Sequence, residues 1–252
     1  MIVLAAGKGE RLLPLTANTP KPLLDLGNGR TLAEEQIHRV QRSGEISEVI
    51  YVVGYLATQI EAKLATVPKG EMTLSIEYNP VYEITNNLIS LWIARHWMDA
   101  DFMVTNGDNL FLADVLKRFV VETSDGIWLA ICPKTDFDED DMKVVLDQGQ
   151  VRIVSKRASP QEAVGESPGL ALARGAKARS LFKAELDRLV RQDVSRHAFW
   201  LEVFNALYAK GVPVHPWRFD GSGSWQEVDF HMDLQLAKDM VRVALPDERE
   251  AA

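Results

Sequence analysis

Residues 1–11 have the sequence Met1-Ile-Val-Leu-Ala-Ala-Gly-Lys-Gly-Glu-Arg11, a short apolar run that leads directly into a glycine-rich stretch. The run is too short for a membrane helix and lacks a basic leader, so we expect a buried strand and not a signal peptide. Small residues after the strand let backbone N–H groups approach phosphate oxygens. Lys8 and Arg11 add positive charge, so the stretch predicts a phosphate-binding loop.

The glycine spacing distinguishes this loop from two other phosphate-binding motifs. It does not fit G-x-G-x-x-G, and no Gly-Lys-Ser or Gly-Lys-Thr follows, which disfavours dinucleotide-binding and P-loop proteins. Residues 7–11 alone could also form a surface turn with two cations. A second segment, Leu15-Thr-Ala-Asn-Thr-Pro-Lys-Pro-Leu23, strengthens the functional interpretation, because its two rigid prolines hold Lys21 in a fixed conformation.

Beyond residue 23, apolar runs alternate with amphipathic stretches, which predicts β-α units around a mostly parallel sheet. We expect one three-layer α/β/α domain over residues 1–245, with a Rossmann-like sheet and a small β-hairpin insertion, and a disordered tail over 246–252. The predicted strands are 2–4, 49–53, 74–78, 101–105, 126–131 and 212–219, with the hairpin at 143–146 and 150–155. The predicted helices are 31–43, 57–64, 85–97, 112–121, 176–190, 199–209 and 233–243, and on 85–97 we expect Leu88, Leu91, Trp92 and His96 to share one face.

Composition excludes several classes of protein. The net charge of −8 disfavours a nucleic-acid backbone binder, and no run approaches the roughly 18 apolar residues of a membrane helix. The single cysteine, Cys132, excludes an internal disulfide and suits a cytoplasmic location. An acidic protein can still bind a polyphosphate if its few cations converge on one loop.

The two N-terminal segments together match L-A-A-G-x-G-x-R followed by Thr-Pro-Lys-Pro, and this combination resembles the nucleoside-diphosphate-sugar pyrophosphorylase superfamily. The resemblance implies the nucleotide-diphospho-sugar transferase fold and a nucleotide held by the loop. It also implies catalytic roles for Lys8, Arg11 and Lys21, the last facing a phosphate. The residues expected to bind the nucleotide through this loop are Leu4, Ala5, Ala6, Gly7 and Gly9.

Two aspartates extend the resemblance. Asn106-Gly-Asp-Asn109 follows a predicted strand and looks like the family's metal-binding aspartate, and Trp225-Gln-Glu-Val-Asp229 fits the second one. An isolated aspartate after a strand is more often a helix cap or a turn residue. Paired with the N-terminal motif, Asp108 and Asp229 are expected to hold Mg²⁺, which prefers oxygen ligands.

Residues 79–92 narrow the comparison. Asn79-Pro-Val-Tyr82 and Thr85-Asn-Asn-Leu-Ile-Ser-Leu-Trp92 are similar to bacterial phosphocholine and aminoalkylphosphonate cytidylyltransferases. Asparagine is also a good helix cap. We therefore expect one of Asn86 and Asn87 to cap a helix and the other to contact a pyrimidine edge or ribose hydroxyl, and the sequence leaves open which.

The second half of the chain supplies the acceptor candidates. The resemblance places Lys156 beside the acceptor's phosphate or phosphonate. The alternative interpretation is that Lys156 is an ordinary exposed lysine. Glu166 lies in a segment that resembles the substrate side of the same group. Trp200 and Trp225 could bind a quaternary ammonium by cation–π contact, although core packing is the more common role of tryptophan. Glu202 or the acidic run 136–141 could supply a countercharge.

These observations predict an Mg²⁺-dependent cytidylyltransferase that transfers CMP from CTP to a small phosphorylated alcohol or phosphonate. The partners are thus CTP, or another nucleoside triphosphate, and a small anionic acceptor, with no nucleic acid and no membrane insertion; a homodimer is left open. A sugar-1-phosphate nucleotidyltransferase is the first alternative. A non-catalytic nucleotide-binding domain is the second, although Lys21, Asp108 and Asp229 are all present.

Overall fold

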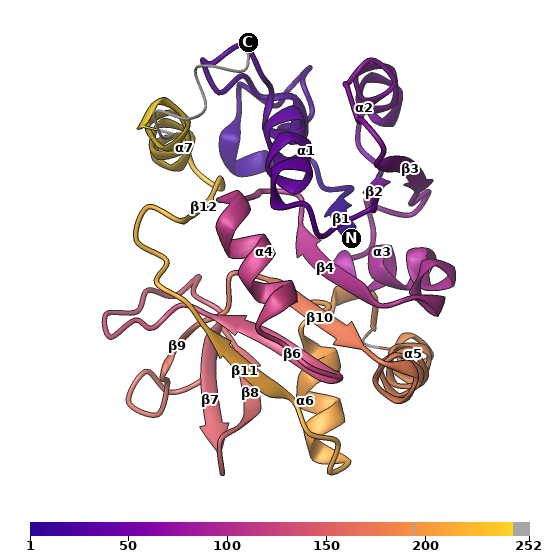
Figure 1. Cartoon of the computed structure of the whole chain (residues 1–252), viewed down its shortest axis with the longest axis vertical. Coiled ribbons are helices and arrows are strands. Elements are labelled where there is room, and N and C mark those ends of the chain that lie inside the picture. Colours follow the sequence, from indigo (N-terminus) through magenta and orange to yellow (C-terminus); the bar gives the residue numbers. More distant parts are fainter. Residues whose placement is uncertain (194, 244–252) are drawn as a thin grey trace.

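The computed structural model describes residues 1–193 and 195–243 and is built on a seven-stranded sheet with the order β11-β6-β10-β4-β1-β2-β3 (Figure 1). Neighbouring strands run parallel except at β10, which is antiparallel to both β4 and β6. The strands of this sheet are β1 (Ile2–Ala5), β2 (Glu48–Val53), β3 (Thr73–Tyr78), β4 (Phe102–Asn106), β6 (Gly126–Ile131), β10 (Leu170–Arg174) and β11 (His215–Arg218).

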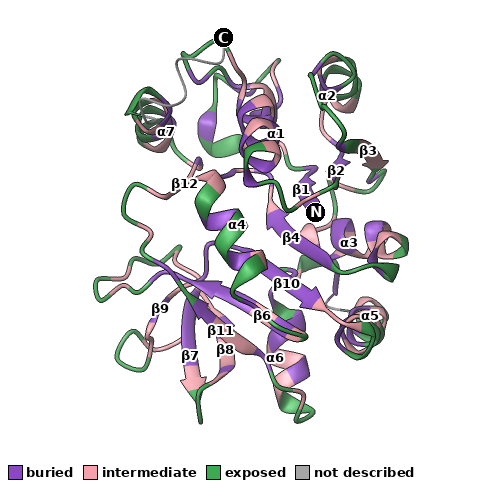
Figure 2. Cartoon of the chain, viewed as in Figure 1, coloured by how far each residue is buried: buried purple, intermediate pink, exposed green. Residues whose placement is uncertain are grey.

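Helices cover both faces of the sheet, because side chains of successive strand residues point to opposite sides. The α-helices are α1 (Leu32–Ser43), α2 (Ala57–Leu64), α3 (Asn87–Ile93), α4 (Ala113–Val121), α5 (Ala176–Val190), α6 (Glu202–Ala209) and α7 (His231–Val243). Ile2 and Leu4 belong to the core cluster formed with α3, α5 and α6. Val3 and Ala5 belong to the cluster formed with α1, α2 and α4. The result is three layers, with buried strands between helices that expose their outer sides (Figure 2).

Two smaller sheets complete the fold. One pairs β5 (Asn109–Phe111) with β12 (Trp225–Glu227), and the other has the order β8-β7-β9, formed by β7 (Lys143–Asp147), β8 (Gln150–Ser155) and β9 (Gly165–Glu166). A third core cluster joins α7 to the segment after the glycine-rich loop, through Leu12, Leu26, Leu32, Leu234 and Val241 among others. This cluster fixes the C-terminal part of the described chain beside the N-terminal loop.

The predicted fold class is confirmed, including the mostly parallel sheet and the hairpin β7–β8. The helix predicted over 85–97 was wrong at both ends. Asn86 has an extended backbone and caps α3, and after Ile93 the chain tightens into a 3₁₀ turn, Ala94–Asp99. His96 therefore does not join the buried face; it is exposed and contacts Glu77 at 2.9 Å.

Two other predicted elements are shorter in the structure. The helix predicted over 199–209 begins at Glu202, and the strand predicted over 212–219 is limited to His215–Arg218. The tail predicted over 246–252, and the end of the domain at 245, lie outside the described residues. Within residues 1–193 and 195–243, no helix combines the length and the apolar character needed to cross a bilayer.

Candidate active site

A cleft of about 780 Å³ lies beyond the carboxyl ends of β1 and β4. These strands pair in parallel, with Leu4 opposite Asn106, so the segments that follow them reach the same edge of the sheet. That edge is where open parallel sheets bind their ligands. The cleft is lined by the glycine-rich loop and by residues from 79–90, 106–108, 134–142, 156, 166–169, 199–201 and 225–233.

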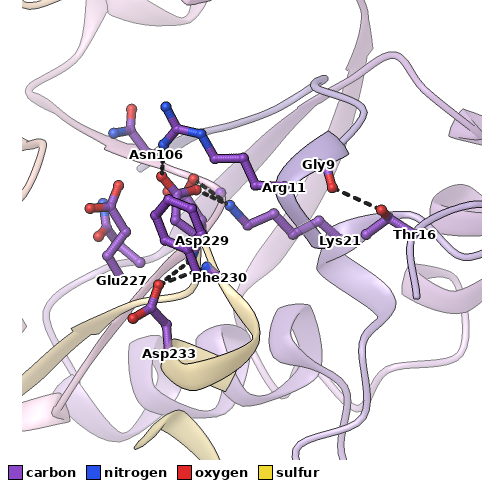
Figure 3. A network of polar contacts seen from close by, with 12 residues as sticks. Gly9, Arg11, Thr16, Lys21, Asn106, Glu227, Asp229, Phe230 and Asp233 are labelled. Atoms are coloured by element: carbon purple, nitrogen blue, oxygen red, sulfur yellow. Dashed lines mark hydrogen bonds and ion pairs between the residues drawn. The ribbon is translucent and has the colours of Figure 1, made fainter. Parts of the chain in front are cut away.

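The glycine-rich loop presents backbone to the cleft. Gly9 has a left-handed φ of 66°, and its carbonyl accepts a hydrogen bond of 2.8 Å from Thr16 Oγ1 (Figure 3). A Cβ atom at Gly9 would lie 3.3 Å from Lys21 Cβ, so this glycine lets the lysine stem pass beside the loop. Lys8, by contrast, is half-buried and forms an ion pair with Glu83 at 2.9 Å.

Lys21 is a buried cation between two carboxylates. Its Nζ donates to Asp108 Oδ2 at 2.9 Å and to Asp229 Oδ1 at 2.6 Å. Burial works against the ammonium form, but the charges of the two aspartates outweigh it and raise the pKa of Lys21. Lys21 therefore stays protonated, and the predicted lysine and both predicted aspartates meet at one point.

Glu227 is a third acidic residue at this point that the sequence analysis missed. One carboxylate oxygen each from Asp108, Glu227 and Asp229 lie within 4.8 Å of one another. Burial, followed by the charges of Asp108 and Asp229, raises the pKa of Glu227 well above its ordinary value. A signal was present in the sequence, since Glu227 and Asp229 are two positions apart in an extended segment and so share a face.

The pairing of β5 with β12 brings these carboxylates together. The strands are antiparallel, with Asn109 opposite Glu227, and Val228 N donates to Asp108 O at 3.0 Å. Asp108 directly precedes β5 and Asp229 lies two residues after β12. An antiparallel pair therefore places residues that are 121 positions apart in the sequence at the same end.

The three carboxylates fit a hard divalent cation. Asp108 Oδ1 is buried and has no hydrogen-bond partner among the described residues, although buried polar atoms normally have one. Oxygen ligands of this kind suit Mg²⁺. Among the described residues, Lys21 is the cation that contacts Asp108, so a metal ion would neutralise negative charge that these residues leave in excess.

Buried hydrogen bonds hold the segment that carries Asp108. Gln36 Nε2 donates to the carbonyls of Gly107 at 3.0 Å and Asn109 at 2.8 Å, and Tyr51 OH donates to Gln36 Oε1 at 2.9 Å. On the opposite side, Asp233 Oδ2 accepts from the backbone N–H groups of Asp229 and Phe230 (Figure 3).

Asp140 joins Arg11 to the predicted acceptor lysine. Arg11 donates to Asp229 Oδ2 at 3.0 Å and to Asp140 Oδ1 at 3.2 Å, and its guanidinium lies over the Phe230 ring. Lys156 donates to the same Asp140 oxygen at 2.8 Å. The structure thus brings the predicted nucleotide and acceptor cations into one cleft.

Glu166, the second predicted acceptor residue, lies behind this group with Lys134 and Asp141. Lys134 Nζ contacts Glu166 Oε2 at 3.2 Å and Asp141 Oδ2 at 2.8 Å. Burial raises the pKa of Glu166 to about 7, and the neighbouring Asp141 carboxyl adds to the increase. Glu202, the other candidate countercharge, accepts from Asn205 and does not line the cleft.

The remaining predicted residues lie at the wall of the cleft. Asn86 is the helix cap, while Asn87 Oδ1 accepts from Trp200 N at 2.9 Å. Trp200 is only 1% exposed, and its Nε1 donates to Asn106 Oδ1, so its ring has almost no surface free for a ligand. Trp225 is half-buried and donates to Asn109 Oδ1 at 2.8 Å. The structure therefore places Trp200 and Trp225 as supports of the segment 106–109.

Residues 1–140, which include the glycine-rich loop, Lys21 and Asp108, match the family model described as nucleotidyl transferase. The chain belongs to the nucleotidyl transferase family. The resemblance predicted from the motifs is thereby confirmed.

The similarity of this chain to its relatives differs in extent. The chain is 29% identical to the CMP-5'-(3-aminopropyl)phosphonate synthase of Streptomyces rubellomurinus, over 94% of this chain and 38% of the relative. It is 34% identical to the choline-phosphate cytidylyltransferase of Streptococcus pneumoniae over 46% of this chain and 48% of the relative. The UTP–glucose-1-phosphate uridylyltransferase of Haloferax volcanii is 31% identical over 55% of both chains. The chain therefore spans less than half the length of the first two relatives.

Among solved structures, the CTP:phosphocholine cytidylyltransferase of Streptococcus pneumoniae superposes with a TM-score of 0.72 at 24% identity, covering 95% of this chain and 97% of that one. This likeness concerns the fold alone, and it extends along almost the whole chain.

Proposed function

We propose that this chain transfers CMP from CTP to a small phosphorylated alcohol or aminoalkylphosphonate, with release of pyrophosphate, in an Mg²⁺-dependent reaction. The observation that carries the proposal is the extent of the similarity to the aminopropylphosphonate synthase. The similar region covers 94% of this chain, and the residues that line the cleft come from positions 4 to 233. The glucose-1-phosphate uridylyltransferase matches 55% of the chain and the choline-phosphate cytidylyltransferase 46%, so each gives less support than the phosphonate synthase, which matches 94%.

In this reaction an oxygen of the acceptor's phosphate or phosphonate attacks the α-phosphorus of CTP. A new P–O bond forms, the bond from the α-phosphorus to the bridging oxygen breaks, and pyrophosphate leaves with the electron pair. The nucleophile is already an anion, so no general base is needed. The chain's task is to position two anions that repel each other and to neutralise the charge that develops on them.

The cleft supplies groups for this task. The glycine-rich loop offers backbone N–H groups to the phosphates, and Lys8, Arg11 and Lys21 supply positive charge. Asp108, Glu227 and Asp229 would hold Mg²⁺, which when bound neutralises charge on the triphosphate and on the departing pyrophosphate. Lys156 lines the same cleft and can orient the acceptor's anionic group there.

A pyrophosphate-release screen tests the proposal. Each of the four nucleoside triphosphates is combined with phosphocholine, 2-aminoethylphosphonate or a hexose 1-phosphate, with and without Mg²⁺. We expect the highest kcat/KM for CTP with one of the first two acceptors. Higher turnover of a hexose 1-phosphate, or no turnover with any pair, would contradict the proposal.

Two variants test the site within the same assay. Lys21→Ala and Asp108→Ala should each lower kcat by at least about 100-fold, because each removes a charge at the point where phosphate charge must be held. Circular dichroism checks that the variants fold. Near-normal turnover in either folded variant would show that the reaction does not use this site.

A further inference from the structure

Asp140 contacts two cations that come from distant segments of the chain. Its Oδ1 accepts from Arg11 Nη2 at 3.2 Å and from Lys156 Nζ at 2.8 Å. Arg11 belongs to the glycine-rich loop, which we assign to the nucleotide, and Lys156 directly follows β8, on the side that we assign to the acceptor. A single carboxylate oxygen therefore links the two substrate regions.

The backbone around Asp140 is held without the help of its carboxylate. The buried Lys143 Nζ donates to the carbonyls of Asp138 at 2.7 Å, Lys156 at 3.0 Å and Asp141 at 3.3 Å. Asp140 N donates to Asp138 Oδ1 at 2.9 Å. Lys143 thus fixes the acidic loop against the end of β8, and the Asp140 side chain is free to change partners.

The ion pairs of Asp140 are of an exchangeable kind. The side chains of Arg11, Asp140 and Lys156 are 44%, 47% and 30% exposed. Exposed ion pairs contribute little to stability, because water screens them and ordering the side chains costs entropy. Substrate phosphates, which carry more charge than one carboxylate, can therefore take over both cations.

Such an exchange leaves Asp140 as an unpaired carboxylate beside a substrate anion. The Asp140 carboxylate would repel a substrate that carries only negative charge. An acceptor with its own ammonium group would replace the lost cations. Because Asp140 Oδ1 and Lys156 Nζ are 2.8 Å apart, one short molecule can place its anionic end on the lysine and its ammonium on the aspartate. The Phe199 ring, 5.4 Å from Lys156 Nζ and 41% exposed, offers an aromatic face nearby.

We propose that Asp140 is a specificity-determining residue that exchanges Arg11 and Lys156 for the ammonium group of a zwitterionic acceptor. The proposal rests on the proposed function and deepens it. In the free protein, Asp140 holds Arg11 and Lys156. When the acceptor binds, Asp140 favours aminoalkyl acceptors over acceptors that carry only negative charge.

The test compares Asp140→Asn with a matched control, Glu139→Gln. Glu139 is the exposed neighbour in the same loop, and it has no hydrogen bond or ion pair in the part of the chain that the structure describes. Both variants remove one negative charge, but only Asp140→Asn removes the carboxylate that pairs with Lys156 and one of the two carboxylates that pair with Arg11, the other being Asp229. Isothermal titration calorimetry with inorganic tripolyphosphate should show about tenfold tighter binding to Asp140→Asn, and a change of less than about threefold for Glu139→Gln.

The second measurement concerns acceptor preference. Calorimetry compares 2-aminoethylphosphonate with ethylphosphonate, which lacks the amino group. The wild type should favour the amino compound, and Asp140→Asn should reduce the ratio of the two affinities at least about tenfold, whereas Glu139→Gln should preserve it. Equal tripolyphosphate affinity in the two variants, or an unchanged ratio in Asp140→Asn, would overturn the proposal. Because both measurements are of binding, they still decide the role of Asp140 if the turnover screen fails.

Discussion

Gly7 and Gly107 are both glycines at the cleft, but an added methyl group would meet different surroundings at each. Apart from Gly7 and its two chain neighbours, no described residue has an atom within 4 Å of the Cβ position at Gly7. At Gly107 the same atom would lie 2.6 Å from Ala5 Cβ and 2.9 Å from Leu4 O. The space at Gly7 is thus available to a ligand, whereas Gly107 is required for the close packing of two backbone segments.

This difference predicts different effects of alanine. Gly7→Ala should keep its Tm within about 2 °C of the wild type while CTP binding weakens about tenfold, since the methyl group intrudes only on the ligand. Gly107→Ala should lose about 1–3 kcal/mol of stability, because the backbone that leads to Asp108 must move. Thermal unfolding and calorimetry with CTP measure both effects. A Gly7→Ala protein that binds CTP normally would show that the phosphates lie elsewhere.

At this scale the sequence predicted the residues that belong to contiguous motifs. Lys21, Asp108 and Asp229 were found because each lies within a recognisable pattern, and the structure brings them into contact. Glu227 was missed because the resemblance pointed to two aspartates only. The role of Asp140 could not be predicted, since its partners are 129 and 16 positions away and only the folded chain brings them together.

The elements around Asp108 act as a support for its side chain. Helix α1 contributes Gln36, which joins the carbonyls on either side of Asp108, and Tyr51 of β2 fixes the Gln36 amide in turn. All of these hydrogen bonds are buried. A buried carbonyl that loses its donor retains the full cost of its desolvation.

Gln36→Leu should therefore destabilise the protein by about 1–3 kcal/mol. It should also increase, about tenfold, the Mg²⁺ concentration that gives half-maximal activity. The second effect follows because the Asp108 carboxylate is no longer held. Gln41→Leu is a suitable control, because Gln41 is on the same helix and donates only to the exposed carbonyl of Pro68. Equal Mg²⁺ dependence in the two variants would mean that Gln36 serves stability alone.

Sequence patterns predicted most elements but not all of their limits. The apolar β-branched run of β2 and the Asp147-Gln-Gly149 turn between β7 and β8 are local properties, and both elements were placed correctly. The start of α3 depends instead on a distant segment, since Asn86 N donates to the carbonyl of Arg196. No local pattern could reveal that contact.

Across the whole molecule, the acidic chain concentrates its functional cations in one place. Convergence of the cations on one loop is the arrangement that would let an acidic chain bind a polyphosphate. The structure shows that they come from several segments of the chain and meet at one cleft, which is lined by Lys8, Arg11, Lys21, Lys134 and Lys156. Carboxylates accompany each of them, so every substrate anion must compete with an internal one.

One of these carboxylates gives the stability of the whole protein a pH dependence. The pKa of Glu166 is raised from 4.5 to about 7, mainly by burial. Between these pH values the folded chain binds a proton that the unfolded chain has released, so increasing the pH disfavours the folded state. The contribution of Glu166 to stability is complete below about pH 4.5 and is lost as the pH rises through about 7.

Glu166→Gln removes this titration, because glutamine resembles the protonated acid at every pH. The Tm of the variant minus that of the wild type should therefore be more positive at pH 8 than at pH 5. Thermal unfolding at unit steps of pH measures this difference, with Glu162→Gln as a control whose carboxylate is 59% exposed. A difference that stays constant for Glu166→Gln would show that the Glu166 carboxyl is already ionised at pH 5, with Lys134 rather than burial deciding its charge.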